Sequence, residues 1–421
     1  MIEKAQAENC FDSYYLALHA FLNEILDGHV RADNIDEIDN KYIGGGFGFS
    51  VEEVEDGRTI VTWVDEASSA WSAGLRPGAA LTEWKSKPSR VAVEEVSTAL
   101  AGPSATDEGR QIKKLQYLTR APIGNQVKIA WRGKGSTVVS DLTLIAYDDD
   151  GLSLKKSYPN SVLSDKLRNL YLGKDDSSPA PKSVVETQIL QGNIYYLRLW
   201  AEMDADLQGT GTAPSTVELV RQAVKQANEQ GCIGMILDIR NNMGGLDEMA
   251  AEIFGSFYST RSFYEYQNAY DPDTNKWILG PIDNQTGEIG LYIKPAHEQF
   301  TGHIIALINH KCVSSGEGIA LKIKNLPTGE TLGFWGTNGS FGLVGVGPGA
   351  KMPGGITVYW PTGQSLDEQK TIQLDSRNDV GGVSPSIRVP MTEENALRVV
   401  EGEDVELQEA IRILGGEPEN P

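Results

Sequence analysis

Hydrophobic positions near the N-terminus repeat with the period of a helix. They fall at spacings of three and four along the chain: Phe11, Tyr14, Leu18, Phe21 and Ile25. This period predicts one amphipathic helix over residues 3–28, and His29 follows directly after the turn Asp27-Gly28. We expect residues 1–42 to form an N-terminal helical segment.

A different pattern begins at residue 43, where hydrophobic runs are short and are separated by glycine, proline and polar residues. The runs that predict strands are 59–64 (TIVTWV), 127–133 (VKIAWRG) and 136–147 (STVVSDLTLIAY). The stretch 67–75 (ASSAWSAGL) is typical of a short helix, and a polar segment at 103–121 leads to the second strand. Residues 43–147 are therefore predicted to be a β-rich domain.

Residues 148–185 are polar and rich in Ser, Asp, Lys and Pro, as is typical of a linker or crossover. Beyond them, nearly continuous apolar runs alternate with amphipathic stretches. The runs predict strands at 193–200, 233–239 and 303–309, and the amphipathic stretches predict helices at 215–230, near Gly245, near Ser314 and at 401–414. This alternation indicates a buried, mostly parallel sheet and an α/β core over 186–421.

Composition excludes some classes of protein. The 421 residues contain 37 Lys plus Arg against 58 Asp plus Glu, a net charge of −21, so nucleic acid and anionic lipid are poor partners. No apolar stretch is long enough to span a membrane. The N-terminal sequence has no basic stretch followed by an apolar run, which leaves a cytosolic protein or one whose signal has been removed.

The cysteines do not indicate a metal centre or a disulfide framework. Cys10, Cys232 and Cys312 are far apart, match no metal-ligand spacing and are odd in number. The apolar surroundings of Cys232 and Cys312 predict small core residues. We expect no metal site and no cofactor.

Two predicted strands run into helices through segments that could carry chemistry. In 236–250 (ILDIRNNMGGLDEMA), the Gly244-Gly245 pair lets backbone N–H groups turn outward, where they can hold an anionic oxygen. A tight strand-to-helix turn without a chemical role is the alternative.

In 306–323 (ALINHKCVSSGEGIALKI), Ser314 stands at the strand-to-helix junction, in the positive field of a helix N-terminus that suits a nucleophile. The same residues also match a capping box, with Ser314 as the N-cap and Glu317 three residues on. The local sequence therefore leaves a nucleophile and a structural cap open.

The sequence GGGFGFSVEE resembles the loop and second strand of PDZ domains, in which backbone N–H groups receive a terminal carboxylate. Here the peptide-binding residues would be Gly46, Phe47, Gly48 and Phe49. The segment 67–81 resembles the helix and turn that follow in PDZ domains, although Ala79 stands where aspartate is usual. A β-rich domain that only packs on the core is the alternative.

The ordered set of motifs resembles the C-terminal-processing and tricorn-core serine peptidases, over roughly residues 15–414. The pattern D-x-R-x-N-x-G-G is matched from Asp238 to Gly245, and S-x-S-x-x-E from Cys312 to Glu317, with cysteine for the first serine. A turn similar to the family's G-x-x-T-x-G, but one residue longer, runs from Gly333 to Gly339. The closing stretch 381–390 (GGVSPSIRVP) is also similar, with Ser386 for the usual aspartate.

The resemblance implies a crotonase/Clp-like α/β catalytic core with Ser314 as the nucleophile. It implies an oxyanion hole from the N–H groups of Gly244, Gly245 and Ser315. It also implies a protein or peptide substrate, such as an unfolded or C-terminally tagged protein, and an extracytoplasmic (periplasmic or secreted) location.

The general base is decided by which branch of the family the chain follows. One branch uses a lysine about 25 residues after the serine, but residues 337–342 (TNGSFG) contain none. The other uses a histidine in a D-x-H sequence after the first helix, which His29 matches. His310, four residues before Ser314, is the rival. The third member in this branch is a carboxylate near the closing stretch, where Asp379 fits the spacing better than Asp375.

Two further hypotheses remain. The departures from the family pattern also suit a catalytically inactive relative that binds a peptide or another ligand. An enoyl-CoA hydratase-like enzyme would share the core fold, but no acid pair or CoA pocket is marked in the sequence.

Overall fold

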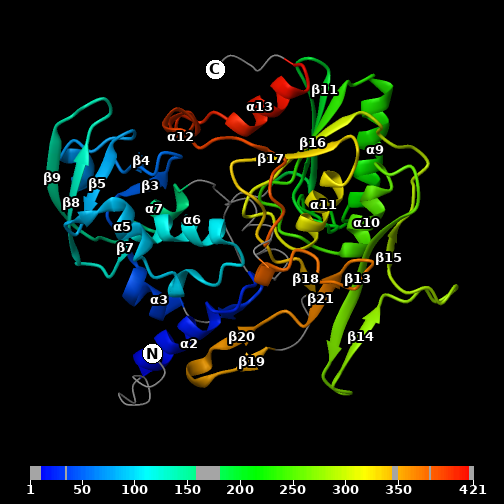
Figure 1. Ribbon diagram of the computed structural model, residues 1–421, viewed down its shortest axis with the longest axis horizontal. Coiled ribbons are helices and arrows are strands. Elements are labelled where there is room, and N and C mark those ends of the chain that lie inside the picture. Colours follow the sequence, from blue (N-terminus) through cyan, green and yellow to red (C-terminus); the bar gives the residue numbers. More distant parts are fainter. Residues whose placement is uncertain (1–10, 34–35, 158–180, 344–348, 379–380, 417–421) are drawn as a thin grey trace.

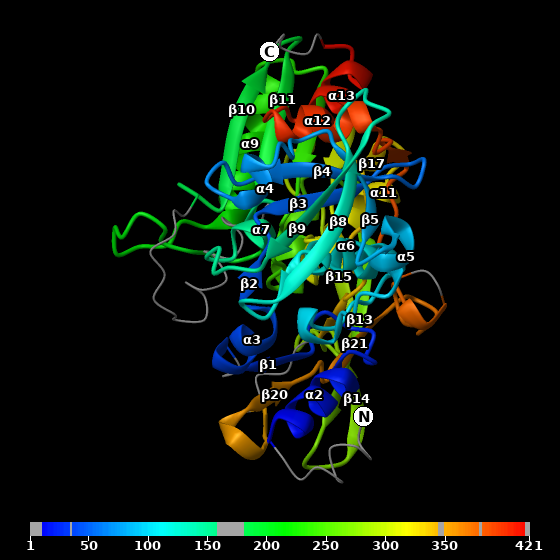
Figure 2. The same ribbon diagram turned by 90° about the vertical axis from the view of Figure 1, so that its left-hand side faces the viewer.

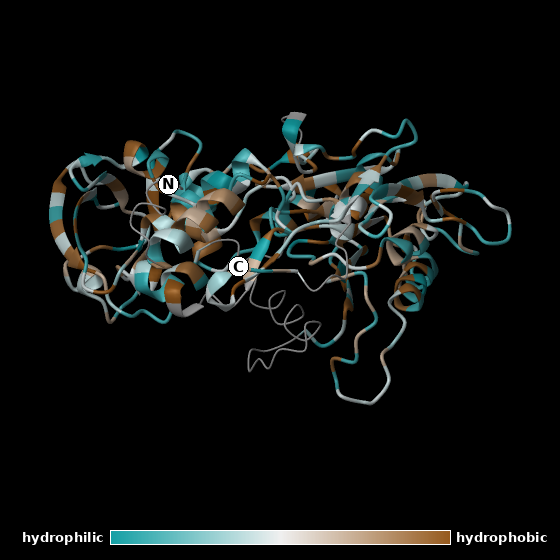
Figure 3. Cartoon of the chain, turned by 90° about the horizontal axis from the view of Figure 1, so that it is seen from below, coloured by the Kyte–Doolittle hydropathy of each residue, from teal (hydrophilic) through white to brown (hydrophobic). Residues whose placement is uncertain are grey.

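The computed structural model describes residues 11–33, 36–157, 181–343, 349–378 and 381–416. Two bodies lie side by side in it, a β-rich module and a larger α/β core, as Figure 1 shows. Brown and teal bands alternate along the helices and strands in Figure 3, as expected where one face of each element packs inward. No helix of the described residues is long and apolar enough to cross a membrane.

The core is built on a mostly parallel sheet, as predicted. Its described strands are, in spatial order, β10 (Val185–Leu190), β11 (Ile194–Leu199), β12 (Gly234–Asp238), β16 (His303–Leu307), β17 (Gly329–Gly333) and β22 (Ile387–Arg388). Only β10 and β11 pair antiparallel, and each later neighbour in this order pairs parallel.

Helices cover both faces of this sheet, because its strands are apolar on both sides. One face packs on α9 (Thr216–Glu229), α10 (Asp247–Phe254) and α11 (Ser315–Lys324), and the other on α13 (Val405–Ile413). Tyr195 and Leu197 point to the first face, and Ile194 and Ile236 to the second. The α/β core is confirmed, and α12 (Glu393–Val400) is an additional helix that the pattern did not predict.

A second, antiparallel sheet in the core was not predicted. Its main path is β14 (Lys276–Gly280), β13 (Ser262–Asp271), β21 (Gly363–Leu366) and β18 (Gly342–Leu343), and β15 (Leu291–Ile293) pairs with β13. Several of these strands pair across long sequence separations, so no local hairpin signal marks them.

The β-rich module has an antiparallel sheet that faces the viewer in Figure 2. Its strands are β3 (Phe49–Glu53), β4 (Thr59–Val64), β5 (Ala80–Trp84), β8 (Gln126–Arg132) and β9 (Val139–Ile145), and β6 (Lys87–Pro88) pairs with β5. Its helices are α4 (Ser69–Ser72), α5 (Ser89–Glu94), α6 (Asp107–Leu118) and α7 (Leu152–Lys155). The polar segment 103–121 therefore contains α6, which buries only a narrow stripe that includes Ile112 and Leu115.

The N-terminal helix ends earlier than predicted, and its buried face is rotated about the helix axis relative to the predicted face. Within the described residues α2 spans Phe11–Leu22, and residues 3–10 of the prediction lie outside the described part. Tyr15, Leu18 and Leu22 are buried, whereas Phe21 is 58% exposed. The buried face of the helix is therefore shifted by one residue position from the predicted buried face.

This N-terminal segment packs on a hairpin from the C-terminal half of the chain. Strand β1 (Arg31–Asp33) pairs antiparallel with β20 (Thr357–Tyr359), which pairs with β19 (Ala350–Lys351). Figures 1 and 2 both show α2 beside this hairpin, and Figure 2 shows β1 next to β20. Tyr15 and Leu18 share a hydrophobic cluster with Ile356. The helix α3 (Asp36–Ile43) and the short pair β2 (Gly45–Gly46) and β7 (Arg120–Ala121) lead into the module.

Candidate active site

Two neighbouring strands bring the predicted glycine turn and Ser314 together. Strands β12 and β16 are adjacent and parallel, with Asp238 opposite Leu307, so the loops after them leave the same edge of the sheet. The two loops are joined directly, because the Val313 N–H donates to the Asn242 carbonyl at 3.1 Å. Segments far apart in the sequence thus become one site.

Ser314 adopts a backbone conformation that ordinary helix caps do not use. Its φ is 59° and its ψ is −131°, whereas an N-cap residue is normally extended. A non-glycine residue in this region costs roughly 1–3 kcal/mol, and such strain concentrates at functional sites. The predicted Glu317 contact is also present, since its Oε2 accepts from the Ser314 N–H at 3.3 Å. Ser314 is partly exposed, and α11 begins at the next residue.

Gly244 lies against the nucleophile. A Cβ at Gly244 would be 2.6 Å from the Ser314 Cβ and 3.3 Å from its Oγ, and the φ of Gly244 is +80°. Its N–H, however, donates to Asn242 Oδ1 at 2.8 Å. In this conformation Gly244 provides close approach, and its N–H, which was predicted as an oxyanion donor, is bonded to Asn242.

The N–H groups of Gly245 and Ser315 are not bonded in this way. Neither has a hydrogen-bond partner among the described residues; Gly245 is exposed, whereas Ser315 is buried. The Ser315 hydroxyl is fully buried and contacts the Gly245 carbonyl at 3.1 Å and the carboxyl of Asp247. Because this hydroxyl is buried and bonded, Ser314 is the serine of the pair that can meet a substrate.

Glu317 ties the nucleophile to a second loop. Besides the Ser314 N–H, its carboxyl accepts from Thr337 Oγ1 at 2.7 Å and from the N–H groups of Gly339 at 2.6 Å and Ser340 at 2.7 Å. Burial raises the pKa of Glu317 to about 7, against the effect of these hydrogen bonds. The Thr337–Ser340 loop is therefore held in place by the same carboxyl that contacts the nucleophile backbone.

The N-terminal segment reaches this loop with the residue next to His29. The Gly28 N–H donates to Ser340 Oγ at 2.6 Å. A Cβ at Gly28 would lie 2.4 Å from Asn338 Oδ1, so the two segments approach each other closely here. Among the described residues no hydrogen bond joins His29 directly to Ser314.

Asp27 is the carboxylate that orients His29 in this structure. Its Oδ1 is 2.9 Å from His29 Nδ1 and accepts from the His29 backbone N–H at 2.8 Å, so the contact to Asp27 engages Nδ1 and not Nε2. Asp375, a predicted candidate for this role, instead forms an ion pair with Arg377 at 2.7 Å. Asp379, the preferred candidate, lies outside the described residues. The D-x-H spacing was the available signal for Asp27.

The rival histidine is placed differently. His310 is buried, and its ring packs edge-on against Trp335 with centroids 6.0 Å apart. Burial, with Lys311 and Lys113 nearby, holds the pKa of His310 well below its usual value. Its Nδ1 has no partner among the described residues, and the ring lies in the interior in this conformation.

The motif residues Asp238 and Arg240 are structural. The fully buried Asp238 carboxyl pairs with Arg198 at 2.8 Å and with Arg240 at 2.7 Å. These guanidinium groups hold the pKa of Asp238 below its usual range despite burial. Arg240 also pairs with Asp404 at 2.7 Å and Glu406 at 3.0 Å, which anchors the start of α13 to the segment after β12.

The predicted peptide-binding loop, Gly46 to Phe49, is buried and bonded in this conformation. Gly46 exchanges two backbone hydrogen bonds with Tyr147, at 2.9 and 3.0 Å. Beside the loop, Ser50 Oγ donates to the Ser153 carbonyl of α7 at 2.5 Å. The edge of β3 therefore contacts the chain's own segment, which continues directly from the module.

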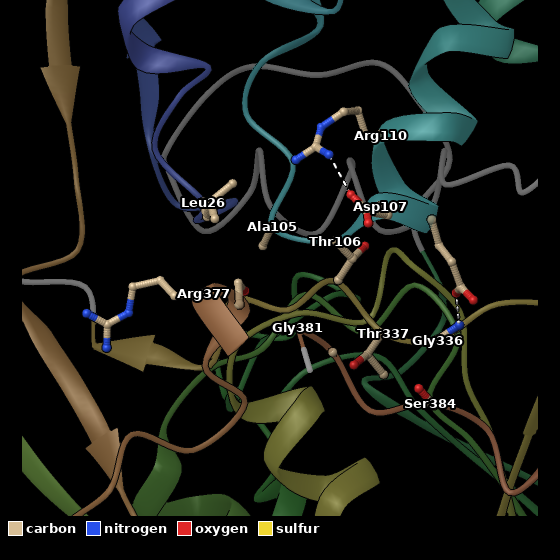
Figure 4. A pocket seen from close by; sticks show the side chains of 13 residues that line it. Leu26, Ala105, Thr106, Asp107, Arg110, Gly336, Thr337, Arg377, Gly381 and Ser384 are labelled. Carbon is tan, nitrogen blue, oxygen red and sulfur yellow. Dashed lines mark hydrogen bonds and ion pairs between the residues drawn. The ribbon is translucent and has the colours of Figure 1, made fainter. Parts of the chain in front are cut away.

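A cavity of about 310 Å³ lies where the module meets the core, between the start of α6 and the loops at 336–337 and 381–384. Figure 4 shows Thr106 and Asp107 across it from Thr337. On one side Glu108 accepts from the Gly336 N–H at 2.8 Å and pairs with Arg388 at 2.7 Å. Neither Ser314 nor His29 lines this cavity. Among the described residues, no group of three or more potential ligands could hold a metal ion.

Comparison with known proteins adds a match to a family model and a likeness of fold. Residues 193–389 match the model of peptidase family S41. No curated protein matches the chain in sequence. The fold resembles mature CPAF complexed with lactacystin, with a TM-score of 0.63 at 12% identity over 96% of this chain and 89% of that one. A CPAF mutant is similar, with a TM-score of 0.63 at 14% identity over 97% and 89%.

Proposed function

From the match of residues 193–389 to the model of peptidase family S41, we propose that the chain is a serine peptidase with Ser314 as its nucleophile and His29 as its general base. The Ser314 Oγ attacks the carbonyl carbon of a peptide bond while its proton passes to His29 Nε2. The N–H groups of Gly245 and Ser315 bind the oxyanion. The C–N bond then breaks and the proton passes to the leaving amine. Water hydrolyses the acyl-enzyme by the same steps.

The observation that carries this proposal is the strained backbone of Ser314 directly against the Gly244 turn. Strain of this kind persists only where surrounding contacts hold it. The Asn242–Val313 hydrogen bond and the Glu317 carboxyl supply those contacts. Two N–H groups without partners among the described residues, on adjacent loops, are what an oxyanion requires.

The case for His29 rests on a chain of contacts rather than on a direct bond. Gly28 contacts Ser340, Ser340 contacts Glu317, and Glu317 contacts the Ser314 backbone. Asp27 presents the ring with Nδ1 engaged, the orientation a general base needs. Catalytic hydrogen bonds are often long without substrate, so we expect the His29–Ser314 bond to form in the complex.

Alanine substitution at each site tests the pair. Ser314→Ala should abolish cleavage of a fluorescent casein substrate, and His29→Ala should lower kcat by roughly 10²–10⁴. His303→Ala is the matched control: among the described residues the His303 side chain pairs with Glu330 near the surface, so this variant should leave kcat unchanged. Cleavage by Ser314→Ala at the wild-type rate would refute the nucleophile.

A fluorophosphonate probe separates the peptidase from an inactive, ligand-binding relative. Such a probe modifies an activated serine, so it should label the wild-type protein at Ser314 and leave Ser314→Ala unlabelled. A folded wild-type protein that is neither labelled nor active on casein would instead favour the binding-only function, which the absence of a lysine at 337–342 first suggested.

Substrate selection is the finer part of the proposal. We propose that the module receives unfolded or C-terminally tagged proteins at Gly46–Phe49, and that α7 must move from β3 for this to occur. A labelled peptide with a free C-terminal carboxylate should bind better than its amidated form, and equal binding of the two would contradict tail recognition. The proposed extracytoplasmic location rests on the family resemblance and is checked by cell fractionation.

A further inference from the structure

A line of buried polar groups stands behind the two oxyanion donors. Ser315 is the first residue of α11, and Asp247 is the first residue of α10. The Ser315 Oγ contacts both the Asp247 carboxyl and the Gly245 carbonyl. One hydroxyl therefore connects the start of the nucleophile helix to the start of the helix that follows the glycine turn.

Asp247 is in turn held by a second carboxyl from a different sheet. Its side chain is in hydrogen-bond contact with Glu265 of β13, which is fully buried. Glu265 also accepts from Ser365 Oγ and from Gln267 Nε2, the latter at 3.0 Å. Two ionised carboxylates have no donor between them, so the contact between Asp247 and Glu265 requires a shared proton.

The surroundings favour retention of that proton. Burial raises the pKa of Asp247 to about 6 and the pKa of Glu265 well above its usual value. Other titratable groups face the pair from the elements packed against it: Glu202, Glu248, Tyr264, Lys322 and His29. The acidic neighbours oppose ionisation of the pair, while His29 favours ionisation of Asp247.

We propose that Ser315 and the hydrogen-bonded Asp247–Glu265 pair form a brace, a set of positioning residues that hold the N–H groups of Gly245 and Ser315 in place for the oxyanion. The reason is geometric: the two donors lie on separate loops, and the Ser315 hydroxyl and Asp247 carboxyl connect the helices that follow those loops. Preorganised donors contribute much of the rate of acyl transfer, and a displacement of about 1 Å can cost roughly 10²-fold. This inference rests on the proposed peptidase function.

Matched variants test this brace. Ser315→Ala and Glu265→Ala should each lower kcat by about 10–100-fold with KM within about twofold, and should slow fluorophosphonate labelling of Ser314 to a similar extent. Ser256→Ala is the control for the serine, since Ser256 is equally buried and its hydroxyl has no partner among the described residues. It should retain kcat.

The conservative variant Glu265→Gln distinguishes positioning from simple packing. A glutamine amide donates permanently to Asp247 in place of the shared proton, so Glu265→Gln should recover most of the kcat that Glu265→Ala loses. In the wild-type protein, deprotonation of the pair should lower kcat at alkaline pH. This loss of kcat should be absent from Glu265→Gln. If Glu265→Ala does not fold, this difference in pH profile and the kcat of Ser315→Ala decide the question.

The outcomes separate this inference from the proposed function. Activity of Ser314→Ala would overturn both. If Ser314→Ala is inactive but Ser315→Ala keeps the wild-type kcat, only the brace is overturned. The same holds if Glu265→Gln loses kcat at alkaline pH as the wild type does.

Discussion

Replacing Gly244 with alanine places one methyl group against the nucleophile. The new Cβ would lie 2.6 Å from the Ser314 Cβ and 2.9 Å from the Val313 carbonyl oxygen. Carbon atoms pack at about 3.5–4.0 Å, so Ser314 must move by roughly 1 Å. A displacement of about this size costs roughly 10²-fold in rate, equivalent to about 2.7 kcal/mol of transition-state stabilisation.

Gly57→Ala is the matched control, because the backbone strain is the same and the contact is absent. Gly57 has φ +78°, against φ +80° for Gly244, and an added methyl group there would have no atom within 4 Å. Both variants should lose about 1–2 kcal/mol of stability from the left-handed conformation. Only Gly244→Ala should lose kcat on the casein substrate and label slowly with fluorophosphonate. A kcat within about threefold of Gly57→Ala would refute the contact argument.

Three further predictions concern buried polar groups. His310→Gln should keep kcat within about twofold of wild type, because the His310 ring packs on Trp335. A loss of kcat as large as that of His29→Ala would instead favour His310 as the general base. Burial raises the pKa of Glu52 to about 8, so the folded protein loses stability as pH rises from about 5 to 8. In urea unfolding at about pH 7.5, Glu52→Gln should be up to about 3 kcal/mol more stable than wild type. A stability difference that does not change with pH would contradict this. Arg240→Lys should lower the melting temperature, with a loss of roughly 2–3 kcal/mol, because an ammonium cannot make the paired contacts to Asp238 and Asp404; an unchanged melting temperature would argue against the network.

Elements with strong local signals were predicted well. Strand β4 matches the predicted 59–64, and α9 lies within the predicted 215–230. The strands on either side of the site, β12 and β16, fall inside the predicted runs. These elements have continuous apolar strands or clear helical periods, which depend only on neighbours in sequence.

Elements that depend on distant partners were missed. Helix α6 was hidden in a polar segment because it buries few residues, and the face of α2 was misassigned because its packing partner is Ile356. Strand β1 pairs with β20, with Arg31 opposite Tyr359, a separation of 328 residues (359 − 31). No local pattern in a three-residue strand predicts such a pairing.

By itself, the sequence determined the chemistry available at the site: a serine at a strand-to-helix junction, a glycine pair at the neighbouring junction, and a D-x-H histidine with no lysine as competitor. Only the tertiary structure decided how these groups are used. It showed that the Gly244 N–H is bonded while the Gly245 N–H has no partner among the described residues, that Asp27 engages His29, and that a carboxyl pair stands behind Ser315. The physical reason is that hydrogen-bond satisfaction and burial are properties of segments brought together in space, whereas residue type and spacing are properties of the chain.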